Sequence, residues 1–160
     1  METIEKRVQR LEDQRAIQEV IYNFSWGTDR NRRDVFLDVF TDDGVLHFKP
    51  GPGVPAGSLP NDPIVGRDQL VAFYERRRRG QDPWPKHVNV NAVIKVDGDE
   101  ATAESAIVFF LERGAVAELV STGRYLDKFR RCADGKWRIS ERIGHVDTLK
   151  TAAFSIVTGT

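Results

Sequence analysis

The chain has 160 residues, of which 40% are hydrophobic and 30% are charged, as is usual for one globular domain with a single core. Lysine plus arginine and aspartate plus glutamate number 24 each, so no net charge attracts nucleic acid or an anionic membrane. The single cysteine, Cys132, excludes an intrachain disulfide, and no apolar run has the length of a membrane span. We expect one soluble, cytoplasmic domain over residues 1–160 that binds neither nucleic acid nor membrane.

Helices are expected in the first half of the chain. Apolar residues recur there every three or four positions, which predicts an amphipathic helix that ends between Gly27 and Asp29. This stripe consists of Ile4, Val8, Leu11, Ile17, Val20, Ile21 and Phe24. A second helix is predicted over 33–40, closed by 41–44, and a third over 66–79.

Two further segments separate the second and third helices. A short strand is predicted over 45–48. Residues 50–63 contain five prolines and three glycines, which disfavour a strand ladder and predict a long loop. We expect this loop to act as a lid over a pocket.

The second half of the chain has the pattern of an antiparallel meander. Its strands are predicted over 87–96, 101–111, 118–131 and 137–146. Turn sequences separate them, namely Asp97-Gly98-Asp99, Arg113-Gly114 and Ala133-Asp134-Gly135. Helices followed by a meander indicate an α+β fold, in which three helices pack on one face of a curved antiparallel sheet. We also expect a homodimer through the sheet, because apolar residues occupy both faces of the strands.

The strand that begins at His87 has a polar face. A period of two places His87, Asn89 and Asn91 on one face, opposite a set of apolar residues. That second set is Val88, Val90, Ala92, Ile94 and Val96. A histidine beside amide donors suits acid-base chemistry, although the pattern alone is more typical of a histidine that makes only local hydrogen bonds.

Several motifs, in this order and spacing, resemble the SnoaL-like branch of the nuclear transport factor 2-like superfamily over roughly residues 5–147. They are Leu11-Glu12-Asp13-Gln14-Arg15-Ala16-Ile17, Thr28-Asp29, Phe40-Thr41-Asp42-Asp43-Gly44, His87 with Asn91, Asp97-Gly98-Asp99, Gly123-Arg124-Tyr125 and Asp134-Gly135-Lys136-Trp137-Arg138-Ile139. The resemblance implies a cone-shaped pocket between the curved sheet and the helices. Because this fold hosts many activities, the site must carry the functional argument.

Within that superfamily, Asp29 and His87 resemble the catalytic pair of lindane dehydrochlorinase, scytalone dehydratase and bile-acid 7α-dehydratase. The resemblance implies that His87 removes a proton and that Asp29 orients its ring, without a metal or organic cofactor. Phe24 stands where the bile-acid enzyme has a tyrosine, so Tyr22, Tyr125 or a water is the candidate general acid.

Two other residues complete the expected pocket. Asn91 is expected to give polar support to a ligand oxygen. Trp26 lies three residues before the helix-ending aspartate and is expected to form an apolar wall beside the Asp29–His87 pair, and Phe24 is expected to contact the ligand as well.

The resulting hypothesis is a cofactor-free lyase or isomerase, dehydratase-like, that acts on a hydrophobic cyclic or polyketide-like small molecule. A polyketide cyclase is a related alternative, because cyclisation also begins with proton removal. A non-catalytic ligand-binding module, or a subunit resembling the small β subunit of ring-hydroxylating dioxygenases, is the alternative from another class. The intact aspartate–histidine pair favours an enzyme.

Two remaining features have weaker functional readings. His47 and His145, with His87, are the only histidines, but their spacing is not that of a metal site. The run from Arg76 to Arg79 continues a helix and is better explained as a solvated helix face than as a nucleic-acid site.

Overall fold

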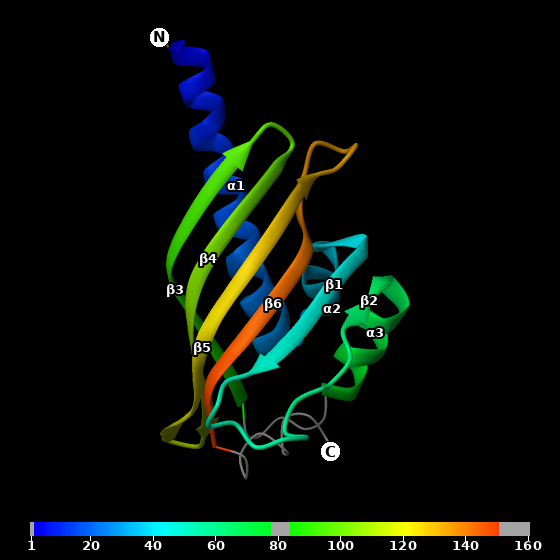
Figure 1. Cartoon of the computed structure of the whole chain (residues 1–160), viewed down its shortest axis with the longest axis vertical. Helices are drawn as coiled ribbons and strands as arrows, with labels where there is room; N and C mark the ends of the chain where they lie inside the picture. Colours follow the sequence, from blue (N-terminus) through cyan, green and yellow to red (C-terminus); the bar gives the residue numbers. More distant parts are fainter. Residues whose placement is uncertain (1, 78–83, 151–160) are drawn as a thin grey trace.

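A computed structural model describes residues 2–77 and 84–150, which form three helices and one six-stranded sheet (Figure 1). The elements are α1 (Ile4–Asp29), α2 (Arg33–Asp38), β1 (Phe40–Pro50), β2 (Ile64–Val65), α3 (Gly66–Arg77), β3 (Trp84–Asp97), β4 (Glu100–Arg113), β5 (Val116–Arg131) and β6 (Trp137–Leu149). The strand order is β2-β1-β6-β5-β4-β3. The predicted α+β class with a curved sheet is thereby confirmed.

One strand pairing differs from the antiparallel sheet that the sequence predicts. β1 runs parallel to β6, while the pairs β3–β4, β4–β5 and β5–β6 are antiparallel as predicted. The difference arises because β1 and β6 are not joined by a hairpin: β2, α3 and the strands β3, β4 and β5 lie between them in the chain. The long α1 crosses one face of the sheet, and α2 and α3 lie beside β1 (Figure 1).

The second helix is shorter than predicted, because Phe40 belongs to the sheet. The Val39 carbonyl accepts a hydrogen bond from the Ile139 N–H at 2.7 Å, and this contact with β6 marks the point where the chain joins the sheet. The segment 41–44, predicted as a closing turn, is an irregular start of β1, where the register against β6 shifts between Phe40 and Val45.

The core lies between α1 and the concave face of the sheet. Ile17, Ile21 and Phe24 of α1 are fully buried in it. The beginning of the predicted apolar stripe is not buried, since Ile4, Val8 and Leu11 are 72%, 47% and 62% exposed. The prediction was wrong for these residues because the first turns of α1 project beyond the sheet (Figure 1).

A β-bulge interrupts β3 and changes which residues face inward. The register against β4 shifts between Val90 and Val93, and Asn91 within the bulge has a φ of 56°. The extra residue reverses the alternation, so Ile94 and Val96 pack against the core while Val90 faces outward. The predicted two-face pattern is therefore wrong beyond Val90.

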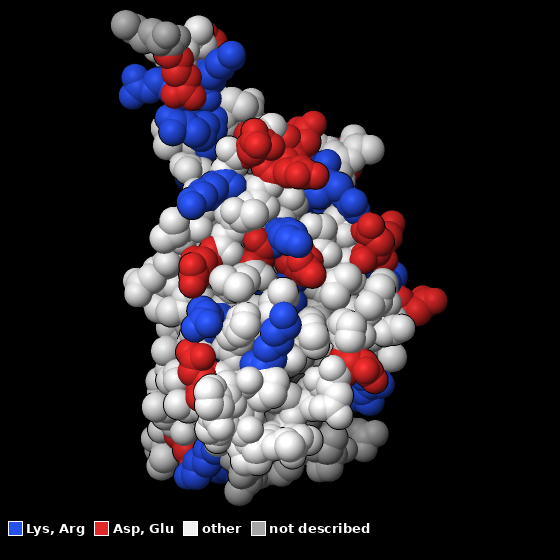
Figure 2. Space-filling view, viewed as in Figure 1, with Lys and Arg blue, Asp and Glu red and all other residues white. Residues whose placement is uncertain are grey.

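The outer face of the sheet carries mixed charges. Figure 2 shows lysines and arginines interspersed with acidic residues, and fewer charges over the lower part of this face. In the described parts of the chain, no helix is both long and apolar enough to cross a membrane. Of the predicted arginine run, Arg76 is exposed on α3, and 78–79 lie outside the described residues.

Candidate active site

The end of α1 is fixed by backbone geometry. Asn31 adopts a left-handed conformation with a φ of 54°, and the Arg32 N–H donates to the Gly27 carbonyl at 3.0 Å. This is the hydrogen bond that closes a Schellman helix end. Gly27 also lies against α2, because a Cβ there would come within 2.6 Å of the Phe36 nitrogen. The last helical residue, Asp29, is thus held in a defined position.

Asp29 binds His87 through both carboxylate oxygens. Its Oδ2 accepts the His87 backbone N–H at 2.7 Å, and its Oδ1 lies 2.5 Å from the ring Nδ1. The contact expected from the sequence is therefore present. Because a carboxylate accepts hydrogen bonds, Nδ1 carries the hydrogen in the neutral ring, and Nε2 is left as the proton acceptor.

The position of Asp29 on its helix favours a charged partner. A carboxylate in the last turn of a helix opposes the helix dipole, and α1 has no basic residue in that turn. Both the carboxylate and the helix end place negative potential beside the ring of His87. The side chains of Asp29 and His87 are only 10% and 8% exposed, so water screens this interaction weakly.

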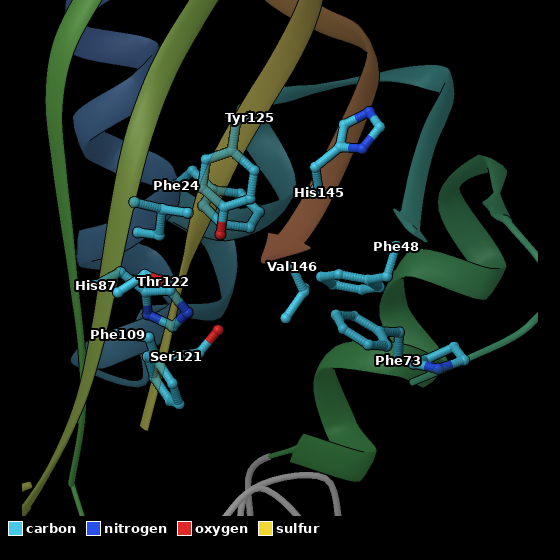
Figure 3. A pocket seen from close by; sticks show the side chains of 13 residues that line it. Phe24, Phe48, Phe73, His87, Phe109, Ser121, Thr122, Tyr125, His145 and Val146 are labelled. Atoms are coloured by element: carbon cyan, nitrogen blue, oxygen red, sulfur yellow. The ribbon is translucent and has the colours of Figure 1, made fainter. Parts of the chain in front are cut away.

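His87 opens onto an aromatic cavity in the concave side of the sheet (Figure 3). The lining residues come from α1, β1, the following loop, α3 and four strands. They are Phe24, Phe48, Pro60, Phe73, His87, Ile107, Phe109, Ser121, Thr122, Tyr125, Gly144, His145 and Val146. Phe109 pairs with His87 across β3 and β4, and its ring centroid lies 4.6 Å from the imidazole. The cavity is therefore mostly apolar around one proton-transfer group.

Two predicted residues line this cavity as expected. Phe24 is fully buried, with its ring edge-on to that of Tyr125 at 5.8 Å between centroids. The hydroxyl of Tyr125 points into the space that His87 faces (Figure 3). Ser121, which the sequence analysis did not single out, also turns its hydroxyl toward this space. Its position on β5, four residues before Tyr125, was the available signal.

Asn91 does not contribute to the cavity, contrary to the prediction. It is exposed within the β3 bulge, which turns it away from His87. Asn89, two residues after His87, instead contacts α1, since its Nδ2 donates to Ser25 Oγ. Ser25 lies one helical turn before Asp29, so two polar contacts join α1 to β3 side by side.

Trp26 and Tyr22 lie outside the aromatic cavity. They are 51% and 43% exposed and line a second hollow between α1 and β3, to which Asp29 and His87 also contribute, so Trp26 lies beside this pair as predicted. The reason is helical geometry, because Phe24 occupies the side of α1 that faces the sheet. Tyr22 cannot act as the general acid in the cavity from this position.

A buried ion pair packs against two aromatic side chains that line the cavity. Arg142 is completely buried, and two of its nitrogens donate to the two carboxylate oxygens of Asp127 at 2.7 Å each. Its guanidinium carbon lies 4.2 Å from the Phe24 ring centroid and 4.3 Å from that of Tyr125. The sequence analysis missed this pair, although period two along β5 places Asp127 on the face of Tyr125 and Phe129.

The other histidines do not gather around His87. His47 pairs with Ile143 in the sheet, and His145, although it is among the lining residues of the cavity, turns its ring away from His87 (Figure 3). Within the described ranges, no group of three histidine, cysteine or acidic side chains is placed to hold a metal ion.

Residues 9–143 match the SnoaL-like domain family, and the chain belongs to this family. An uncharacterized protein of Mycobacterium tuberculosis strain H37Rv, Rv2910c, is 29% identical over 140 residues, which cover 85% of this chain and 86% of that protein. The fold is shared with solved structures. An NTF2-like protein with a cystatin-like fold from Novosphingobium aromaticivorans has a TM-score of 0.74 at 21% identity, over 96% of this chain and 97% of that one.

A second solved structure is a protein of the kind considered above as the non-catalytic alternative. The β subunit of a putative aromatic-ring-hydroxylating dioxygenase from the same bacterium has a TM-score of 0.71 at 23% identity, over 89% of this chain and 94% of that one. At this level of identity, the likeness extends to the fold.

Proposed function

We propose that the protein is a cofactor-free lyase or isomerase that removes a proton from a hydrophobic cyclic or polyketide-like small molecule. The observation that carries this proposal is the Asp29–His87 contact at the wall of an aromatic cavity, with Nε2 left as the acceptor. A histidine whose other nitrogen is fixed by a carboxylate is a common general base near neutral pH.

The proposed step uses side chains of this chain only. His87 Nε2 takes a proton from a carbon next to a carbonyl or to a carbon that bears a leaving group. The electron pair of the broken C–H bond moves toward the carbonyl oxygen to form an enolate, or forms a double bond as the leaving group departs. Asp29 stabilises the resulting imidazolium and keeps the ring in place. Isomerisation, elimination and cyclisation all share this first transfer.

The apolar surroundings favour the transfer. Phe24 and Phe109 contact the imidazole and exclude water from it. The Asp29 charge therefore acts on the ring through a medium of low polarity, where electrostatic interactions are stronger than in water.

Deuterium exchange into a panel of uncharged cyclic ketones in D2O, followed by mass spectrometry, tests the proposal without knowledge of the natural substrate. Wild-type protein should catalyse exchange at the carbon beside the carbonyl for at least one compound. His87→Ala should abolish it, and Asp29→Asn should slow it on the order of a hundredfold, because the ring loses its tautomeric anchor. His47→Ala is the matched control, since His47 lies on β1 and is not among the described residues that line the cavity.

Each variant must first show a wild-type circular dichroism spectrum and melting transition. Exchange that persists in folded His87→Ala would reject His87 as the base. An inactive wild-type protein across the panel would favour a non-catalytic ligand-binding module or subunit.

A further inference from the structure

The long α1 carries a second apolar stripe on the side turned away from the core. Ile17, Ile21 and Phe24 form its buried side. At about 3.6 residues per turn, a different set of apolar residues shares the opposite side. This outer stripe consists of Ile4, Val8, Leu11, Tyr22 and Trp26, which are 72%, 47%, 62%, 43% and 51% exposed. Single exposed apolar residues are common on soluble proteins, whereas a line of them along one helix indicates a binding surface.

The middle of the outer stripe is charged. Arg15 and Glu19 lie between its two apolar ends, with Arg15 Nε 3.3 Å from Glu19 Oε1 and with 82% and 60% of their side chains exposed. Along α1 the outer stripe is therefore aliphatic near Val8, charged at its centre and aromatic near Trp26. Such a stripe is complementary to a reversed copy of itself, because each end meets an apolar end and each charge meets its opposite.

We propose that α1 pairs in an antiparallel arrangement with α1 of a second copy of this chain through the outer stripe. A two-fold axis midway between Arg15 and Glu19 places Arg15 opposite the partner's Glu19 and Val8 opposite the partner's Trp26. Each contact then occurs twice. A parallel pair would instead place Arg15 beside Arg15 and Glu19 beside Glu19, an arrangement that the repulsion of like charges disfavours.

The antiparallel pair would bring the partner next to Asp29 and His87. Tyr22 and Trp26 line the hollow between α1 and β3 to which Asp29 and His87 also contribute. The first turns of α1 project beyond the sheet, so in a second copy they are free to lie over this hollow (Figure 1). The partner's Val8 would thus help to exclude water from the side of the Asp29–His87 contact that faces away from the aromatic cavity.

This helix pair is distinct from a dimer through the outer face of the sheet, since α1 crosses the other face (Figure 1). Only the two ends of the outer stripe are apolar, so we expect a weak interface with a dissociation constant on the order of 100 µM. Val90 is exposed on β3, and Val90→Glu leaves the outer stripe unchanged. Measurements in this variant therefore isolate the helix pair.

Sedimentation equilibrium of Val90→Glu from micromolar to roughly 500 µM protein tests the proposal. The mean mass should rise from one toward two monomer masses over this range. Val8→Gln with Leu11→Gln should raise the dissociation constant about tenfold or more, because glutamine keeps the helix but removes apolar contacts that occur twice. Val116→Gln with Leu119→Gln is the matched control, since both residues are exposed apolar residues of β5.

Disulfide cross-linking tests the antiparallel arrangement, in a Cys132→Ser background that removes the native thiol. A mixture of Val8→Cys and Trp26→Cys should form mixed disulfides faster than either variant forms them with itself. A parallel pair would instead link Val8→Cys to itself fastest.

Four results would overturn the proposal. They are a mass that stays at one monomer up to the highest concentration, association that survives in Val8→Gln with Leu11→Gln, equal weakening in the β5 control, and self-linked Val8→Cys as the fastest product. Circular dichroism must show an unchanged helix content in each variant. Because the readouts are masses and cross-links, they do not depend on the proposed proton transfer.

Discussion

The Trp137 Nε1–H donates to Asp13 Oδ1 at 3.1 Å and joins α1 to β6 across 124 positions of sequence. Arg131 adds a salt bridge to the same oxygen at 2.7 Å. Burial raises the pKa of Asp13, but the hydrogen bonds from Trp137, Arg131 and Gln9 outweigh burial and bring the pKa below its ordinary value. The ionised form of Asp13 thus ties the sheet to the helix that carries Asp29.

This contact predicts a defined pH dependence of stability. A carboxyl group whose folded pKa is lowered stabilises the fold above its unfolded pKa, and this contribution is lost as pH falls through the folded pKa. Asp13→Asn should lower the free energy of unfolding by about 1–3 kcal/mol at pH 7. The difference from wild type should shrink below about pH 4. Urea titrations at both pH values measure it, and a difference independent of pH would contradict the assignment.

Gly27 should not tolerate a side chain. An added Cβ would meet the Phe36 backbone nitrogen and Cα at 2.6 and 2.7 Å, so α1 and α2 would have to move apart. Gly27→Ala should cost about 1–3 kcal/mol of stability and slow the proposed proton transfer, because Asp29 lies two residues further along. Gly53→Ala is the control, since its Cβ would meet no atom within 4 Å. Thermal melts of the two variants should differ clearly.

The Arg142–Asp127 pair should be costly to break and cheaper to replace as a whole. Arg142→Met leaves Asp127 buried without its cation, which should cost about 3–5 kcal/mol. The double variant Arg142→Met with Asp127→Leu removes both charges and should recover much of that loss. Chemical denaturation of the two single variants and the double variant measures the coupling. Additive losses would show that the pair acts through packing alone.

The loop over 51–63 should become more protected when the cavity is filled. Val54 and Leu59 are buried, Pro60 lines the cavity, and the Gly51 N–H donates to the Val146 carbonyl at 2.7 Å. These contacts would anchor the two ends of the predicted lid. Hydrogen exchange with and without a saturating cyclic ketone of the panel above should show slower exchange around Leu59. Unchanged exchange throughout this loop would argue against a lid.

A homodimer through the outer face of the sheet remains a prediction. Val88, Val90 and Leu119 are exposed, and the lower part of this face carries few charges (Figure 2). Such a surface favours self-association. Light scattering after size exclusion at micromolar concentration should give twice the monomer mass, and Val90→Glu should reduce it to one. A monomeric wild-type mass would exclude the dimer at that concentration.

The sequence predicts the elements better than the site. The turns at Gly98, Gly114 and Gly135 lie where predicted, because a positive φ leaves a clear trace in the sequence. The Asp29–His87 contact was also predicted, but from the family resemblance and not from a local pattern. The outward position of Asn91 was not predictable, because no sequence pattern indicates the β-bulge that shifts the alternation of β3.

The surroundings of His87 depend on tertiary packing. Trp26 is three residues from Asp29, but only the docking of α1 decides which side of the helix faces the sheet. Asp127 and Arg142 are directly opposite each other in the β5–β6 register, and their burial becomes evident only once that register is known. The periodicity of a strand or helix shows which residues share a face. Which residues that face contacts is determined only when the sheet and helices pack together.

The edge position of β3 gives Asp29 a second consequence. β3 is the last strand in the order, and an outer strand with bare amide groups can recruit a foreign strand and start aggregation. Asp29 Oδ2 occupies the His87 amide and places a negative charge at that edge. Asp29, which is proposed to orient His87, would therefore also hinder aggregation through the edge of β3. Its loss would reduce the solubility of the protein as well as its activity.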